Sequence, residues 1–125
     1  MINLDRLTMF VSSTAANGVA DGETLLYFAQ RGDRVWARYS GGKVVRGWLV
    51  GRWRNANLLG FRYAQIEDGR TVHAGQSLCN VQHLPDGRLR LIEHFEWSTR
   101  VGSGVNVFDE LSCGVCVNEN EGVSP

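Results

Sequence analysis

Short runs of alternating apolar and polar residues, each closed by a turn signal, follow one another along most of this 125-residue chain. Gly41-Gly42, Asp68-Gly69 and Asp86-Gly87 separate such runs, and these residue types accept the positive φ of tight hairpin turns. The runs cover residues 4–11, 24–30, 34–39, 43–53, 58–66, 70–81, 88–98 and 105–111. The pattern therefore predicts about eight short strands joined by hairpins, with residues 15–23 as a loop.

The connections between these runs favour one β architecture over another. Short antiparallel strands in this number fold either as a sandwich or as a closed barrel. A Greek-key sandwich needs a long crossover, whereas every connection here has the length of a hairpin. We therefore expect an all-β, up-and-down antiparallel barrel over residues 1–111, followed by a flexible C-terminal tail at residues 112–125.

Composition argues against several classes of protein. Thirteen basic and thirteen acidic side chains give a net charge of zero, which disfavours a protein whose main partner is a polyanion. No apolar run approaches the roughly 20 residues of a membrane span, and the first residues lack the basic and apolar regions of a secretory signal. Three cysteines, an odd number, suit a reducing compartment. We expect a cytoplasmic protein without membrane contact.

Alternation also predicts which side chains face the inside of the barrel, because successive residues of a strand point to opposite faces. The predicted inward set comprises Val35, Ala37, Tyr39, Val45, Gly47, Leu49, Gly51, Trp53, Leu59, Phe61, Tyr63, Gln65, His73, Gly75, Ser77, Cys79, Leu89, Leu91, Glu93, Phe95 and Trp97. Its small members leave space, and its tyrosines, histidine and glutamate offer polar groups. A mostly apolar cavity with a few convergent polar groups is typical of a site for a small molecule.

Several motifs resemble those of a known group of proteins. They are Ala37-x-Tyr39-Ser40-Gly41-Gly42, Gly47-x-Leu49-x-Gly51 and Asp86-Gly87-Arg88-x-x-Leu91-x-Glu93-x-x-x-Trp97. Over residues 14–111 the chain is similar to short bacterial proteins that automated pipelines label N-acetylglutamate synthase. The resemblance implies a calycin-like barrel, the architecture of lipocalins, fatty-acid-binding proteins and avidins. An acetyl-CoA site of the usual kind needs a Gly-rich loop that opens a helix, and no such helix is predicted here.

The chain also departs from that group at two places. It has Ser77 where the group has cysteine, and Val81-Gln82 where the group has Pro-Glu. Pocket chemistry shared with the group is therefore not assumed.

Glu93 is the first candidate for a functional side chain. It lies on an apolar strand face between Leu91 and Phe95, where a carboxylate must be paired, hydrogen-bonded or protonated. As a functional group it would orient a ligand or act as a general acid or base with a raised pKa. As a structural group it would bond to tyrosine or arginine within the barrel.

His73 is predicted to share the interior with Glu93, either as a ligand donor, as a catalytic partner, or as a core histidine without function. The candidate catalytic residues, for an enzyme, are Glu93 and His73. The candidate ligand-binding residues are Tyr39, Phe61, Tyr63, His73, Ser77, Glu93 and Trp97.

Cys113-Gly114-Val115-Cys116 forms an isolated C-x-x-C near the end of the chain. A zinc site would need two further ligands, and a redox motif would need a helix start to lower the thiol pKa. Neither is predicted, so we expect no metal and no cofactor.

Arginine and tryptophan alternate on the predicted outer face of two neighbouring strands. Trp36 and Arg38 lie on the first, and Arg46, Trp48 and Arg52 on the second. Such a face suits a homodimer interface, which the exposed rings favour, or single-stranded nucleic acid, which the net charge disfavours. Three functions therefore stay open: binding of a small, largely apolar molecule, catalysis by a small barrel enzyme (isomerase, cyclase or hydrolase), and nucleic-acid binding.

Overall fold

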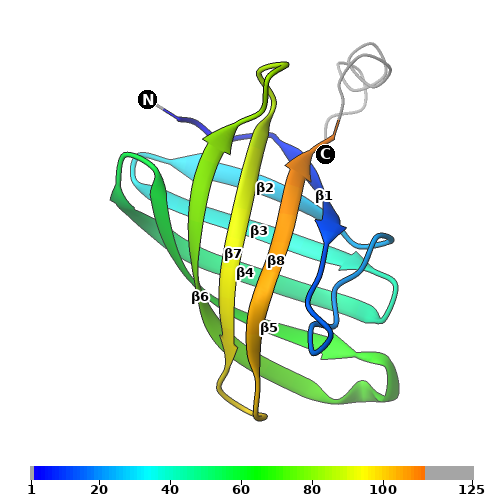
Figure 1. Ribbon diagram of the computed structural model, residues 1–125. Helices are drawn as coiled ribbons and strands as arrows, with labels where there is room; N and C mark the ends of the chain where they lie inside the picture. Colours follow the sequence, from blue (N-terminus) through cyan, green and yellow to red (C-terminus); the bar gives the residue numbers. More distant parts are fainter. Residues whose placement is uncertain (1, 112–125) are drawn as a thin grey trace.

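The computed structural model describes residues 2–111, which form a closed barrel of eight antiparallel strands (Figure 1). The strands are β1 (Thr8–Ser13), β2 (Leu25–Arg31), β3 (Arg34–Gly41), β4 (Val44–Asn55), β5 (Leu58–Glu67), β6 (Val72–His83), β7 (Leu89–Trp97) and β8 (Ser103–Glu110). Each strand pairs with the next, and β8 pairs with β1 to close the barrel. The predicted all-β, up-and-down topology is confirmed, because every connection joins neighbouring strands.

Helix is nearly absent from the part of the chain that the structure describes. Its one helical element is a 3-10 turn at Asp68–Arg70, and residues 14–24 form a loop between β1 and β2. No helix within residues 2–111 is long and apolar enough to cross a membrane. No described segment is a Gly-rich loop that opens an α-helix, the feature that an acetyl-CoA site of the usual kind needs.

In β3 to β7, the strands for which inward residues were predicted, the faces follow the predicted alternation with one exception. Val45 was expected inside, but it is 56% exposed while Val44 is 1% exposed. The cause is a β-bulge, because β4 carries one more residue than β3 and β5 between Val44 and Gly47. A bulge shifts the alternation by one position, so the interpretation of Val45 as an inward residue was wrong.

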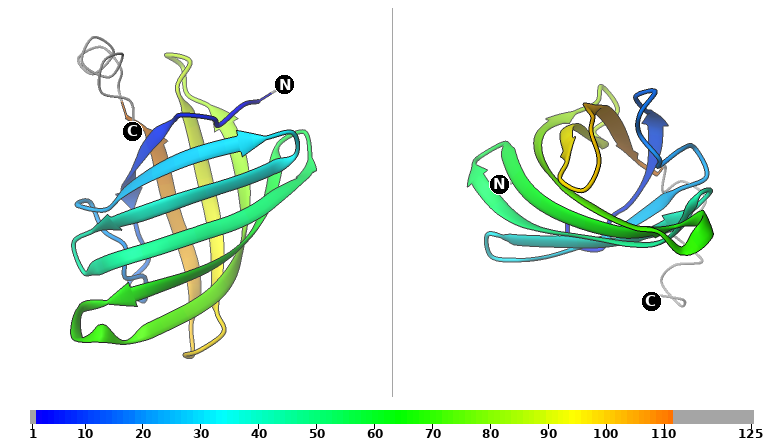
Figure 2. Two further views of the ribbon diagram at one scale, coloured as in Figure 1. Left: turned by 180° about the vertical axis from the view of Figure 1, so that it is seen from behind. Right: turned by 90° about the horizontal axis from the view of Figure 1, so that it is seen from below.

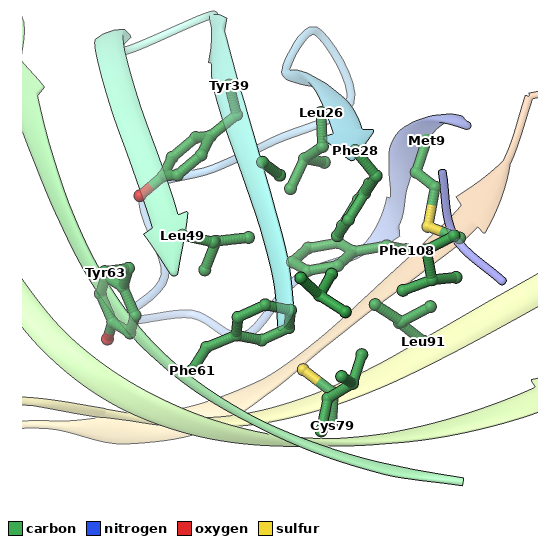
Figure 3. Packing of buried hydrophobic residues seen from close by; sticks show 14 of the residues in the cluster. Met9, Leu26, Phe28, Tyr39, Leu49, Phe61, Tyr63, Cys79, Leu91 and Phe108 are labelled. Carbon is green, nitrogen blue, oxygen red and sulfur yellow. The ribbon is translucent and has the colours of Figure 1, made fainter. Parts of the chain in front are cut away.

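The barrel has one packed half and one half with a cavity. The packed half lies at the end that holds the β2–β3, β4–β5 and β6–β7 turns. Its side chains include Met9, Val35, Leu59, Cys79 and Leu91, each with no exposed surface. In Figure 3 Met9, Cys79 and Leu91 lie to one side, while the hydroxyls of Tyr39 and Tyr63 point away from them.

Two inward glycines do not leave the empty space that their small size predicts. A side chain on Gly47 would overlap the ring of Tyr39, and one on Gly75 would overlap the hydroxyl of Tyr63. The registers place these residues opposite each other, Tyr39 against Gly47 and Tyr63 against Gly75. Each tyrosine therefore lies over a cross-strand glycine and fills its space, which makes the cavity small.

Candidate functional site

The cavity lies at the end of the barrel that holds the β1–β2 and β7–β8 loops, and Figure 2 (right) views the barrel from this end. It has a volume of about 30 Å³. Its walls are formed by Gly18, Val19, Ala20, Leu26, Tyr39, Leu49, Tyr63, Gln65, Glu93, Phe95, Trp97, Asn106 and Phe108. Polar groups from β3, β5, β7 and β8 therefore meet in a mostly apolar surround.

Glu93 is buried at the centre of this site. It is 4% exposed and lies opposite Asn106 of β8. The amide of Asn106 donates to Glu93 Oε1 over 3.0 Å, and the hydroxyl of Thr14 donates to Asn106 Oδ1 over 2.7 Å. A chain of hydrogen bonds thus links the β1–β2 loop to the buried carboxyl, so the loop and the acid are coupled.

Burial raises the pKa of the Glu93 carboxyl above its ordinary value of 4.5. The hydrogen bond from Asn106 opposes this rise, and so does the nearby Ser77 hydroxyl. Ser77 Oγ is itself buried without a partner that meets strict hydrogen-bond geometry, so we regard Asn106 as the principal donor. Glu93 therefore has fewer donors than an ionised buried carboxylate needs.

A second polar chain crosses the rim of the barrel. Tyr39 Oη donates to Gln65 Oε1 over 2.7 Å, and Gln65 Nε2 donates to Glu67 Oε2 over 2.9 Å. Arg100 Nη2 donates to Glu67 Oε1 over 2.7 Å. Burial, followed by the negative charge of Glu93, raises the pKa of the Tyr39 hydroxyl well above its ordinary value. Tyr39 therefore stays a neutral hydrogen-bonding group at physiological pH.

The β1–β2 loop forms part of the cavity wall. Gly18, Val19 and Ala20 contribute to the lining. Trp97 Nε1 donates to the carbonyl of Asn17 over 3.2 Å, and Asn17 Nδ2 donates to the carbonyl of Ser103 over 2.7 Å. These bonds attach the loop to β7 and β8 beside the cavity.

Four of the seven predicted ligand-binding residues line the cavity: Tyr39, Tyr63, Glu93 and Trp97. Phe61 and Ser77 are buried but lie outside the lining, and Phe61 instead packs 6.5 Å from the ring of Phe28. Both lie farther along their strands toward the packed half, where apolar side chains close the barrel.

His73 lies outside the cavity, at the rim. It is half-buried, and its Nδ1 lies 2.8 Å from the hydroxyl of Thr99. Its ring stands edge-on to Trp97, with the centroids 6.2 Å apart. Gly75 lies opposite Trp97, the last residue of β7. His73 is the preceding inward residue of β6, so it lies beyond the end of β7 and has no partner residue there. The structure therefore does not bring Glu93 and His73 together as a catalytic pair.

Sequence reasoning missed Asn106 and Thr14. Asn106 stands between Gly104 and Phe108 on one face of β8, so alternation in this last strand was a usable signal. Thr14 lies in a loop, where no periodicity indicates a direction. Only the fold shows that its hydroxyl reaches Asn106.

Among residues 2–111, no three His, Cys, Asp or Glu side chains are grouped so that they could hold a metal ion. Cys113 and Cys116 lie outside the described residues. The predicted flexible tail also lies there and stays untested.

Substituting Glu93 with glutamine is expected to change how stability depends on pH. A carboxyl whose folded pKa is raised binds its proton more tightly in the folded state, so stability falls as pH rises from about 4.5 through the raised value. Glu93→Gln lacks this loss and still offers Asn106 an acceptor. Urea unfolding at about pH 5 and about pH 8 should show the variant gaining relative to wild type at the higher pH. Parallel pH profiles would mean that Glu93 is not desolvated.

Comparisons with known proteins agree with this architecture. Residues 2–111 match the family model described as Avidin-like protein. No curated protein and no solved structure matches the chain.

Proposed function

Because the chain belongs to the avidin-like family, we propose that its barrel binds a small, largely apolar molecule in the cavity beneath the β1–β2 loop. The observation that carries this proposal is the buried carboxyl of Glu93, which lines the cavity with one principal hydrogen-bond donor. An internal acid that only stabilised the fold would be expected to have its acceptor sites filled. A ligand with an N–H or O–H group would supply the missing donor.

The size of the cavity restricts how such a ligand enters. About 30 Å³ accommodates little more than water, since one water needs roughly 10–15 Å³ on this scale. A larger molecule must displace the segment Gly18–Ala20, and the two bonds made by Asn17 are those that would break. The apolar part of the ligand would then replace Val19 and Ala20 against Leu26, Leu49, Phe95 and Phe108.

Native mass spectrometry of the purified protein tests the proposal even while the ligand is unidentified, because a co-purifying molecule appears as added mass. Calorimetry with a defined probe follows. Biotin is a suitable first probe, since avidin-like proteins bind small ligands such as biotin. Glu93→Gln is expected to weaken binding of whichever molecule is found by about 1–3 kcal/mol, the value of a charge-assisted hydrogen bond.

Glu96→Gln is the matched control, because Glu96 lies on the same strand but faces outward. It should bind like wild type. Equal affinity for wild type and Glu93→Gln would remove Glu93 from the site. If neither bound mass nor heat of binding is detected for any small molecule, the proposal is wrong.

An enzyme of the same shape is the second candidate, and the raised pKa of the Glu93 carboxyl favours it. Such an isomerase, cyclase or hydrolase would use Glu93 as its general acid or base without His73, which lies at the rim. Glu93→Gln would then lower turnover by roughly 10²–10⁴-fold, the usual contribution of proton transfer. If Glu93→Gln lowers the affinity for the ligand and wild type shows no turnover of that ligand, the protein is a binding protein and not an enzyme.

A further inference from the structure

Although the net charge of the chain is zero, basic and acidic residues are unevenly distributed along it. Between residues 34 and 66 there is no aspartate or glutamate. The same stretch contains seven basic residues: Arg34, Arg38, Lys43, Arg46, Arg52, Arg54 and Arg62. This stretch forms the consecutive strands β3, β4 and β5, so the fold places the cations on one side of the barrel.

The registers of these strands bring the cations together with two exposed tryptophans. We define the Arg/Trp face as the outward residues Arg34, Trp36, Arg38, Arg46, Trp48, Val50, Arg52 and Arg62. Arg38 lies opposite Trp48, and Trp36 lies opposite Val50. Trp36 and Trp48 are therefore diagonal neighbours in the register of β3 and β4, two strands that lie side by side in Figure 2 (left).

Arginines also lie directly beside one another on this face. Arg34 is paired with Arg31 of β2 and with Arg52 of β4, which makes a row of three cations across three strands. Like charges directly opposite each other destabilise a sheet. None of the four ion pairs seen among residues 2–111 involves a member of the Arg/Trp face. The positive charge of this face is therefore left without acidic partners in the described part of the chain.

The aromatic residues are exposed in the middle of this charge. Trp36 is 38% exposed and Trp48 is 46% exposed. A surface hollow is lined by residues that include Arg34, Trp36, Trp48 and Arg52. Arginine and tryptophan side chains thus line one depression on the outer surface of the barrel.

We propose that the Arg/Trp face binds single-stranded nucleic acid. Guanidinium groups recognise phosphate through paired hydrogen bonds, and exposed rings on a sheet stack on unpaired bases. Both chemistries occur side by side at the hollow, which Arg34 and Arg52 line together with the two tryptophans. The Arg38 guanidinium lies over another outward ring, that of Tyr27, 4.6 Å from its centroid. A duplex hides its base faces, so it would use the arginines but not the rings.

A second copy of the chain fits this face less well. The sequence favoured a homodimer through Trp36 and Trp48, a prediction that no finding tests. Each copy would bring the arginines of this face, which have no acidic partners among residues 2–111, to the shared interface, and like charges across an interface are costly. An acidic protein would satisfy the arginines without needing the rings.

Fluorescence anisotropy with a short labelled oligothymidylate, at several salt concentrations, tests this proposal. Trp48→Ala and Trp36→Ala are each expected to weaken binding by about 5- to 150-fold, the loss of one stacked base. Arg34→Gln and Arg52→Gln should each reduce the slope of log affinity against log salt by about 0.7. Because these side chains are exposed, circular dichroism should show an unchanged barrel for every variant.

Val105→Ala and Arg6→Gln are the matched controls. Val105 is 39% exposed on β8, and the Arg6 side chain is 92% exposed before β1, so both lie off the Arg/Trp face. Neither should change oligothymidylate affinity.

Three results would contradict binding of single-stranded nucleic acid by the Arg/Trp face. Tryptophan variants that bind oligothymidylate like wild type would exclude stacking. Equal affinity for polyglutamate, for a duplex of the same length or for phosphatidylserine vesicles would show that the face recognises negative charge alone. A dimer in sedimentation that Trp48→Glu dissociates, with no oligothymidylate binding, would assign the face to a second copy of the chain.

Discussion

Leu91→Ala is expected to lower the free energy of unfolding by about 2–5 kcal/mol, a large part of the total stability of a domain this size. Leu91 has no exposed surface and lies between Val81 of β6 and Phe108 of β8. Packed strands on both sides cannot collapse into the space that the side chain leaves. Urea denaturation followed by circular dichroism would measure the loss.

Leu78→Ala is the control for this prediction. Leu78 lies on the outer face of β6 and is 45% exposed, so its truncation should change stability by no more than about 0.5 kcal/mol. If the two variants were equally stable, the packed half of the barrel would not be the main hydrophobic core.

Gly47→Val is expected to destabilise the barrel by about 1–3 kcal/mol or more and to disturb the cavity at the same time. A side chain at Gly47 would occupy the space of the Tyr39 ring. The ring would have to move, which breaks the hydrogen bond from Tyr39 to Gln65. Thermal or urea unfolding reports the loss of stability, and a shift in ligand affinity reports the change at the site.

A double-mutant cycle shows whether the ring is the cause. In a Tyr39→Ala background the space over Gly47 is free, so Gly47→Val should cost less, with a coupling energy of about 0.5–3 kcal/mol. Gly22→Ala serves as a control, because a side chain at Gly22 meets nothing within 4 Å. Additive effects of the two substitutions at residues 39 and 47 would contradict this packing.

Much of the candidate site could be predicted from strand alternation. Glu93, Tyr39 and Tyr63 were placed inside because each shares a face with apolar neighbours, and each lines the cavity. Alternation says nothing about how far along the barrel a residue lies relative to another strand. His73 was therefore expected beside Glu93, although strand register places it at the rim.

The charge distribution is a second property that the sequence alone did not predict, because it depends on which strands are neighbours. Net charge describes the whole chain, and it disfavoured a polyanion as the main partner. Strand pairing gathers Arg31, Arg34 and Arg52 into one row on the outer surface. Local charge density, which depends on that pairing, governs the affinity of a surface for phosphate.

The sequence by itself determined the approximate strands, their hairpin order and, apart from Val45, the inner face of the five strands from β3 to β7. These properties depend on contacts between near neighbours, which a period of two and a turn signal encode directly. Tertiary structure decided the bulge that turns Val45 outward, the tyrosine rings that fill the glycine positions, and the bonds from Thr14 through Asn106 to Glu93. Each of these joins residues far apart in the chain, and their distance depends on register and packing across the whole barrel.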